Sequence, residues 1–505
     1  MTRRTVLLAA TVVAATLLAP AAARAAGNVD VAVAGGKLVI AGDDASNDVT
    51  IDHGGLGPGE LRLTPNAMTT VNGVGAPAVF SGVTKGIVAE LVGGDDILEL
   101  VAVDLEGKLV VDGGDGDDDV ALEFTHIRGT TKIDFGIGSN QIALGNGSAI
   151  DGKLDVKDEG SGIVTIEEGS FVGGGVKAKL GLGGILQITN SGEVAGKVDV
   201  AGGGGIVQVL DGSAVHGPLK AKLGDGNYIV QVIDSSAVDG KLDVKAGAGN
   251  GIVQVLNGSM VHDDLKAKLG AGNHIVQVLN SSAIDGKVDV KAAAGQQIVQ
   301  VMGGSAVHGD VKAKLSAGDT VVAVRDASIV DGKLVVATGD DDDIVTIDDG
   351  SSVGGDIKLA LRGGLSSVTV QGAAVAIGGK LDIKTGAGTA ALQIEMAGVV
   401  GDVKAKLGGG GNFFGIDDAS LGGKLDLRTG DGNDVVEIGN ATAILGSAKI
   451  AVGDGMNNVA VTSSTVGGDL TIKAGSGDDM IDVTGTTVGG AQKIDAGGGA
   501  NTILP

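Results

Sequence analysis

The chain of 505 residues contains no cysteine and no tryptophan, and only one tyrosine, six phenylalanines and six prolines. Without cysteine it forms no disulfide, and it offers no N-terminal cysteine for lipid attachment. With so few aromatic rings, the core has to be thin and built from Val, Leu, Ile and Ala. A thin core over so long a chain is typical of stacked repeats and not of a spherical domain.

Positive charge is also scarce. The chain has 37 Lys and Arg residues and 62 Asp and Glu residues, which gives a formal net charge of −25. So acidic a protein repels a phosphate backbone, and nucleic acid is therefore not an expected partner. Beyond the first residues no apolar run is long enough to span a bilayer, so we expect no transmembrane span in the mature chain. What the chain has in excess is glycine, with 93 residues, which argues against helices.

The N-terminal residues have the pattern of an export signal. Arg3 and Arg4 precede an apolar run from Thr5 to Leu18, and residues 23–25 read Ala-Arg-Ala, a small-residue cleavage site. A twin-arginine signal and a general secretory signal both fit this pattern. We expect residues 1–25 to be removed, and the mature protein to be secreted or to lie at the cell surface or in the periplasm.

A repeat of about 22–23 residues dominates the remaining chain. Each unit holds two segments of alternating apolar and polar residues, such as 241–246 and 252–256, separated by a Gly-rich turn. A unit this short cannot bury its own apolar face, so neighbouring units must stack. The repeats align on the motif Val-x-Gly-x-Leu, in which Ile or Leu also occupies the first position. These first positions are Ile150, Val172, Val194, Val215, Val238, Val261, Ile284, Val307, Val330, Val353, Ile377, Val399 and Leu421.

We therefore predict an all-β protein, a single elongated parallel β-solenoid with one coil per repeat and a right-handed β-helix as the expected form. The solenoid is predicted to span residues 83–488. Residues 26–82 are less periodic and are predicted to form a small N-terminal cap of β-strands. Residues 489–505 are predicted to form a C-terminal cap, because an uncovered last coil would expose its strand edges.

At two outward positions the charge changes sign from one repeat to the next. Equivalent residues of consecutive coils are neighbours in a solenoid, so opposite charges attract there. The pattern predicts two ladders of ion pairs that fix the register, because a slip by one coil would oppose like charges. The first charge column is Lys241, Asp264, Lys287, Asp310, Lys333, Asp356, Lys380, Asp402 and Lys424. The second charge column is Asp155, Lys177, Asp199, Lys220, Asp243, Lys266, Asp289, Lys312, Val335, Lys358, Asp382, Lys404 and Asp426.

Three further columns each allow two interpretations. A row of like-charged residues is either a solvated row that keeps the sheet from sticking, or a cationic stripe for an anionic polymer or for an acidic face of another copy. A His/Asp column is either a charge ladder or a set of His–Asp metal pairs. A Gln column flanked by isoleucines either stabilises the sheet through stacked amides or forms a protein contact. The like-charged row is Lys157, Lys179, Lys222, Lys245, Lys268, Lys291, Lys314, Lys384, Lys406 and Arg428. The His/Asp column is His216, Asp239, His262, Asp285, His308 and Asp331, and the Gln column is Gln187, Gln208, Gln231, Gln254, Gln277 and Gln300.

Three acidic turns read GGDGDDDVA (113–121), TGDGNDVVE (429–437) and AGSGDDMID (474–482). They resemble the Gly-rich repeat of secreted RTX, or haemolysin-type, calcium-binding proteins, and the coils also resemble those of secreted bacterial parallel β-helix proteins. The RTX resemblance implies Ca²⁺ held between stacked turns by carbonyl and carboxylate oxygens, which are the ligands that Ca²⁺ requires. Solvated acidic turns without metal are the alternative. The implied ligands are Asp115, Asp118, Asp431, Asp434 and Asp479.

In function, the sequence favours an exported structural or adhesive rod of the cell surface or extracellular matrix, self-associating and stabilised by calcium, and not an enzyme. The alternative is a protein that binds surface polysaccharide or degrades it as a lyase does. A lyase needs a cleft with acidic, basic and sugar-stacking aromatic groups. The only aromatic cluster is Phe413–Phe414, which core packing explains more simply.

Overall fold

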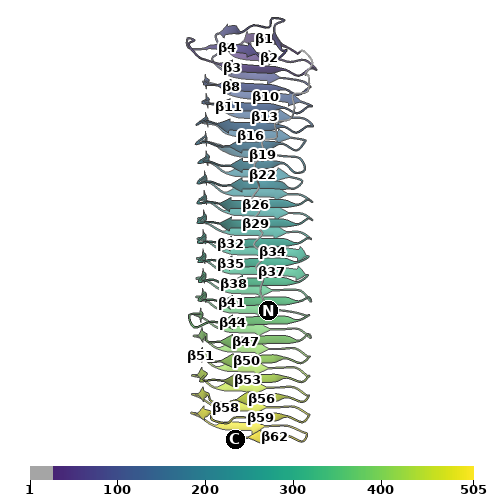
Figure 1. Cartoon of the computed structure of the whole chain (residues 1–505), viewed down its shortest axis with the longest axis vertical. Helices are drawn as coiled ribbons and strands as arrows, with labels where there is room; N and C mark the ends of the chain where they lie inside the picture. The colour runs from purple at the N-terminus through teal and green to yellow at the C-terminus, as the bar shows by residue number, and fades with distance from the viewer. Residues whose placement is uncertain (1–26) are drawn as a thin grey trace.

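The computed structural model describes residues 27–505, which form strands β1 to β62 and no helix. The predicted export signal, residues 1–25, lies outside the described residues. About 18 coils stack into one straight rod, roughly 90 Å long at about 4.8 Å per coil (Figure 1). The prediction of a single parallel β-solenoid is confirmed.

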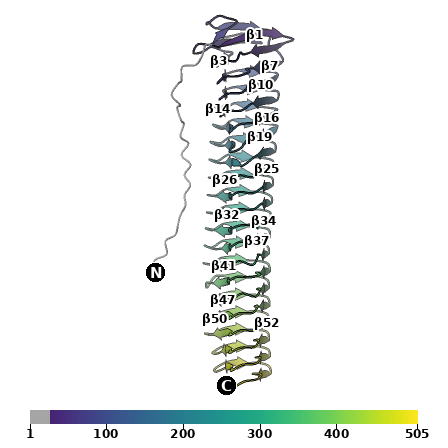
Figure 2. The ribbon, with the colours of Figure 1, turned by 90° about the vertical axis from the view of Figure 1, so that its right-hand side faces the viewer.

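Each coil contributes one strand to each of three parallel sheets, which run the length of the rod (Figures 1 and 2). In one central coil these strands are β31 (Leu265–Leu269) in the first sheet, β32 (His274–Leu279) in the second and β33 (Ala283–Ile284) in the third. The next coil adds β34 (Val288–Ala294), β35 (Gln297–Met302) and β36 (Ala306–Val307). All three pairings are parallel, and each residue meets the residue 23 positions later.

The coil turns sharply between the second and third sheets, where two consecutive residues adopt left-handed backbone conformations. Asn257 and Gly258 have φ angles of 59° and 73°, and Asn280 and Ser281 in the next coil have 57° and 61°. Gly, Asn and Asp enter this region most easily, which explains why the repeat ends in a Ser/Asn/Gly segment.

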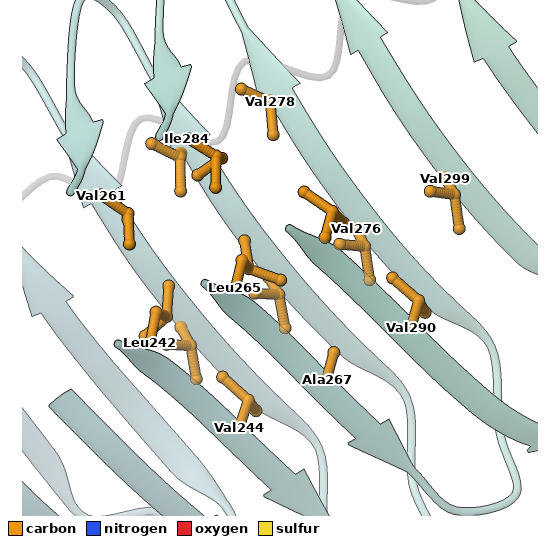
Figure 3. Packing of buried hydrophobic residues seen from close by; sticks show 14 of the residues in the cluster. Leu242, Val244, Val261, Leu265, Ala267, Val276, Val278, Ile284, Val290 and Val299 are labelled. Atoms are coloured by element: carbon orange, nitrogen blue, oxygen red, sulfur yellow. The ribbon is translucent and has the colours of Figure 1, made fainter. Parts of the chain in front are cut away.

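A single thin core lies between the three sheets. The most deeply buried apolar side chains of each coil are two from the first sheet, two from the second and one from the third. In the central coil these are Leu265, Ala267, Val276, Val278 and Ile284, all at most 2% exposed (Figure 3). Leu269 of the first sheet adds a further core residue and is 6% exposed. Burying a Val, Leu or Ile contributes about 1.5–3 kcal/mol, so stability accumulates coil by coil without aromatic residues.

The N-terminal end differs from the rest of the stack because it contains antiparallel pairs. β1 (Asn28–Ala34) pairs antiparallel with β2 (Lys37–Ala41), and β3 (Asp48–Asp52) does so with β4 (Glu60–Pro65). β1 also pairs parallel with the short β5 (Thr70–Val71), and β2 pairs parallel with β7 (Gly86–Glu90) of the following coil.

The C-terminal segment, residues 489–505, was expected to cap the rod but adds strands to the stack. β61 (Gln492–Asp495) pairs parallel with β58 (Leu470–Lys473), and β62 (Thr502–Leu504) with β59 (Met480–Asp482). The repeat motif has decayed here, yet the backbone continues the same hydrogen bonding. Within residues 27–505 there is no helix that could cross a bilayer.

Candidate functional site

The first charge column forms the predicted ladder at the edge of the first sheet. Three of its aspartates lie within ion-pair distance of the lysine in the preceding coil. The pairs are Lys241–Asp264 (2.9 Å), Lys333–Asp356 (2.8 Å) and Lys380–Asp402 (3.1 Å). Asp264 also accepts the backbone N–H of Lys287 in the following coil at 2.9 Å. This hydrogen bond, with the Lys241 ammonium, lowers the pKa of Asp264, so one carboxylate links three successive coils.

The second charge column has the predicted register but few direct contacts. Asp243 lies opposite Lys266, and Lys266 opposite Asp289. Among residues 27–505, however, the only ion pair between coils in this column is Asp155–Lys177, at 3.2 Å. The prediction of a continuous ladder of direct ion pairs is wrong here. Lys312 pairs instead with Asp310 of the first charge column in the same coil, at 3.2 Å. A long, flexible lysine side chain has several acidic groups within reach, and an exposed pair gains little.

The His/Asp column forms hydrogen-bonded pairs between consecutive coils, a geometry that fits the first of its two interpretations. The Nδ1–H of each histidine donates to a carboxylate oxygen of the aspartate in the next coil, in the pairs His216–Asp239 (2.8 Å), His262–Asp285 (2.8 Å) and His308–Asp331 (2.7 Å). The hydrogen bond to Asp239 raises the pKa of His216. In the described part of the chain, no three His, Cys, Asp or Glu side chains converge as a metal-binding group.

The Gln column forms one continuous amide ladder along the second sheet. The Nε2 of each glutamine donates to the Oε1 of the glutamine in the next coil at 2.6 to 2.8 Å. All five hydrogen bonds point in the same direction along the rod. The ladder runs through Gln187, Gln208, Gln231, Gln254, Gln277 and Gln300.

Two rows of half-buried apolar side chains flank the amide ladder on the outer surface of the second sheet. One row is Ile206, Ile229, Ile252, Ile275 and Ile298, and the other is Leu210, Ile233, Leu256, Leu279 and Met302. None of these positions or the glutamines between them carries a charge. We call the three rows together the amide face. On a chain of net charge −25, this surface is the candidate interaction site.

The five predicted calcium ligands are divided between the surface and the interior. Asp115 and Asp431 are exposed on their turns, whereas Asp118, Asp434 and Asp479 are at most 2% exposed.

In the first acidic turn, the two aspartates also face opposite neighbours. Asp118 Oδ1 accepts the N–H of Asp96 in the preceding coil at 3.0 Å, and Asp115 Oδ1 accepts that of Ile137 in the following coil at 3.0 Å. The structure does not bring these oxygens together as a shared donor set, and calcium binding at these turns stays a prediction.

The buried aspartates belong to a polar column at the corner between the first and second sheets, which the sequence reasoning missed. Asn412 shows what this corner requires, because its Nδ2 donates to the carbonyls of Gly408 and Gly410, both at 3.0 Å. An aspartate has no such N–H, and one oxygen of Asp118 is buried without a hydrogen-bond partner. Burial raises the pKa of Asp118 to about 7.

A sequence signal for this corner column did exist. Asp96 and Asp118 are followed by Asn140, and further along the rod Asn412, Asp434, Asn457 and Asp479 alternate between the amide and the acid. A surface calcium turn has no reason to alternate in this way, whereas a buried polar ladder does.

A buried serine ladder at the opposite corner was also missed. The Oγ of each serine accepts the backbone N–H of the serine in the preceding coil at 3.1 to 3.3 Å. The sequence signal was a serine two residues before each of seven consecutive repeat anchors, from Val215 to Val353. The ladder consists of Ser213, Ser236, Ser259, Ser282, Ser305, Ser328 and Ser351.

The aromatic pair does not line a cleft. Phe414 is completely buried and Phe413 half-buried, both in β50 (Phe413–Asp417). Two shallow hollows on the first sheet are open to solvent and lined without aromatic residues. Comparisons of the chain with family models, with curated proteins and with solved structures found no match.

Proposed function

We propose that the protein is an exported structural rod of the cell surface or extracellular matrix that associates side by side with a second copy through its amide face. The observation that carries the proposal is the unbroken glutamine ladder inside a charge-free surface on a strongly acidic chain. No catalytic role is part of the proposal. Export rests on the signal pattern of residues 1–25, and stabilisation by calcium on the acidic turns.

Charge selects the amide face over the other surfaces. Two copies that each carry a formal charge of −25 repel one another over most of their surfaces. Contact through the amide face removes no ionised group from water, so it avoids the desolvation cost that other faces incur. The isoleucine and leucine rows gain from burial, while the glutamine amides are already hydrogen-bonded to one another.

The size of the amide face sets the strength of the association. Five coils at about 4.8 Å and strands of five residues at about 3.3 Å give roughly 400 Å² per copy, or roughly 800 Å² in total. Specific, stable interfaces bury about 1,200–2,000 Å². Association is therefore weak and reversible for free rods, and it becomes significant where many rods are held close together.

The test is the concentration dependence of the molar mass in solution, measured by sedimentation velocity and light scattering. The informative variant is Ile229→Lys/Ile275→Lys, which places two charges on the amide face. Its matched control is Ala201→Lys/Ala337→Lys, which adds the same charge on the first sheet, at gaps in the like-charged row.

Wild type and control should show the same rise in mass with concentration, and the amide-face variant should stay monomeric. A wild type that stays monomeric at the highest attainable concentration would overturn the proposal, as would equal association of both variants. Melting curves establish that both variants are folded.

A further inference from the structure

Part of the like-charged row forms an uninterrupted positive surface on the first sheet. Lys222, Lys245, Lys268, Lys291 and Lys314 occupy five consecutive coils, each in register with the next. We call this set the lysine stripe. Within residues 27–505, the ammonium groups of Lys222, Lys268, Lys291 and Lys314 have no acidic partner within ion-pair distance, and that of Lys245 is 3.8 Å from Asp243. Five unpaired or weakly paired like charges at intervals of about 4.8 Å repel one another.

The three turns in the middle of the lysine stripe lack the acidic residues found in other turns. Residues 247–250, 270–273 and 293–296, which follow Lys245, Lys268 and Lys291, contain no Asp or Glu. At the two ends of the stripe, Asp225 lies in the turn after Lys222 and the exposed Asp319 in the turn after Lys314. The neutral turns therefore coincide with the middle of the stripe, where the positive charge is uncompensated on that side.

On its other side the stripe borders the second charge column, whose signs alternate and cancel. Asp243, Lys266, Asp289 and Lys312 follow one another in register there. The positive potential over the stripe therefore survives locally, because charges beyond a Debye length of about 8–10 Å are screened in physiological salt.

A hollow lies in the middle of the lysine stripe. It has a volume of about 440 Å³, and its lining includes Lys268, Lys291, Leu269, Ala292 and Ala293. A smaller hollow of about 170 Å³ lies further along the same sheet, lined in part by Arg362 and Lys384. Each hollow has two basic residues and no acidic residue in its lining, although acids outnumber bases in the whole chain.

We propose that the lysine stripe and its hollow bind a linear anionic polysaccharide, laid along the rod with its carboxylate or sulfate groups against successive lysines. Lysine suits this role because its ammonium is a mobile point charge that imposes no fixed geometry on the anion. The small Ala and Gly residues beside the lysines allow a sugar ring to approach the backbone. The site goes beyond the proposed association, because it lies on the first sheet and leaves the amide face on the second sheet free.

The lining argues for a polysaccharide and against a nucleic acid. Single-stranded nucleic acids bind through aromatic side chains on which the bases stack. No aromatic side chain lines either hollow, and none interrupts the lysine stripe. The large negative net charge also disfavours a polymer with a charge on every phosphate.

The test compares two variants of equal net charge. The stripe variant is Lys245→Gln/Lys268→Gln/Lys291→Gln/Lys314→Gln, and the control is Lys108→Gln/Lys153→Gln/Lys449→Gln/Lys473→Gln, which removes four exposed lysines of the first sheet outside the coils of the stripe. Binding of fluorescently labelled alginate oligosaccharides is followed by anisotropy at low ionic strength, with labelled dextran as the neutral probe and single-stranded DNA as the competing polyanion.

Wild type should bind alginate and not dextran, and its affinity should fall as salt is added. The stripe variant should bind at least about tenfold more weakly, and the control within about twofold of wild type. Equal losses in the two variants would show a net-charge effect and overturn the site. Alginate binding no tighter than dextran would also overturn it, and tighter binding of DNA than of alginate would overturn the choice of polymer.

Discussion

At the scale of single residues, Asp118 shows how the corner of the solenoid restricts a side chain. Two asparagines of its column, Asn412 and Asn457, donate their amide N–H groups to turn carbonyls, and for Asn457 these are Gly453 and Gly455 at 3.0 and 3.2 Å. A carboxylate in the same place turns an oxygen toward acceptors, and only its protonated form can donate. Burial in this place disfavours the ionised carboxylate, and the pKa of Asp118 is therefore raised to about 7.

Replacing Asp118 by asparagine should therefore stabilise the protein at alkaline pH. Because the pKa of Asp118 is raised above its ordinary value of 3.8, its stability contribution is fully present below pH 3.8 and is lost as the pH rises through about 7. We expect Asp118→Asn to gain about 1–3 kcal/mol at pH 8 and clearly less at pH 5, with the gain disappearing toward pH 3.8. Thermal melting at the two pH values measures this difference.

The control for this substitution is Asp431→Asn, which changes an exposed carboxylate of an equivalent turn and should have little effect at either pH. If Asp118→Asn lowered the melting temperature equally at both pH values, the carboxylate would be needed in its ionised form and the buried-ladder explanation would be wrong.

At the scale of the element, a strand and its corners are held to the next coil by side-chain ladders as well as by backbone hydrogen bonds. The serine ladder is the most deeply buried of these, because Ser213 to Ser351 are at most 1% exposed. The Oγ of Ser259 accepts the backbone N–H of Ser236, which lies in the preceding coil. Removing one hydroxyl therefore leaves a buried N–H without an acceptor.

We expect Ser259→Ala to destabilise the protein by about 1–3 kcal/mol, the typical cost of a buried donor without a partner. The change leaves no steric conflict, since Ala397 and Ala419 are buried just before the repeat anchors Val399 and Leu421. Differential scanning calorimetry measures the loss, with Ser161→Ala in an exposed turn as the control. Melting temperatures that agree between the two variants would show that water or another acceptor replaces the hydroxyl.

The outward positions of the strands could be predicted from the sequence, whereas those of the corners could not. Alternation of apolar and polar residues separates inward from outward side chains within a strand, so the glutamine ladder and the register of both charge columns were predictable. The alternation ends at a corner, where the backbone takes left-handed conformations and a side chain can point either into the core or out to solvent. Asp118 therefore resembled a calcium ligand in sequence and lies buried in the structure. The ion pairs of the second charge column could not be predicted either, because register fixes Cα positions but not where a lysine directs its ammonium group.

At the scale of the whole molecule, the buried acids and the surface ladders respond to pH in opposite directions. Burial raises the pKa of Asp343 to about 6, so this residue, like Asp118, favours the folded state more as the pH falls. Asp264 and Asp402 behave oppositely, because backbone and lysine hydrogen bonds lower their pKa values. Their stabilisation is present above pH 3.8 and is lost as the pH falls through the lowered values.

Stability should consequently be greatest in mildly acidic solution. We expect the melting temperature to rise from pH 8 to between about 5 and 6, as Asp118 and Asp343 take up protons and His216 becomes charged. It should fall again below about pH 4, as the first charge column loses its carboxylates. A pH series of melting curves checks this, and a melting temperature that falls steadily from pH 8 downward would contradict it.

The uniform direction of the five amide hydrogen bonds, from Gln187 to Gln300, gives the rod an electrical polarity. Aligned amide dipoles add, so the two ends of the ladder carry partial charges of opposite sign. Two neighbouring rods lower their energy when these dipoles oppose, that is, when one rod is turned end for end relative to the other. Such a contact is isologous and closed by a two-fold axis. Each rod has one amide face, so growth through it ends at the pair instead of continuing into a fibre.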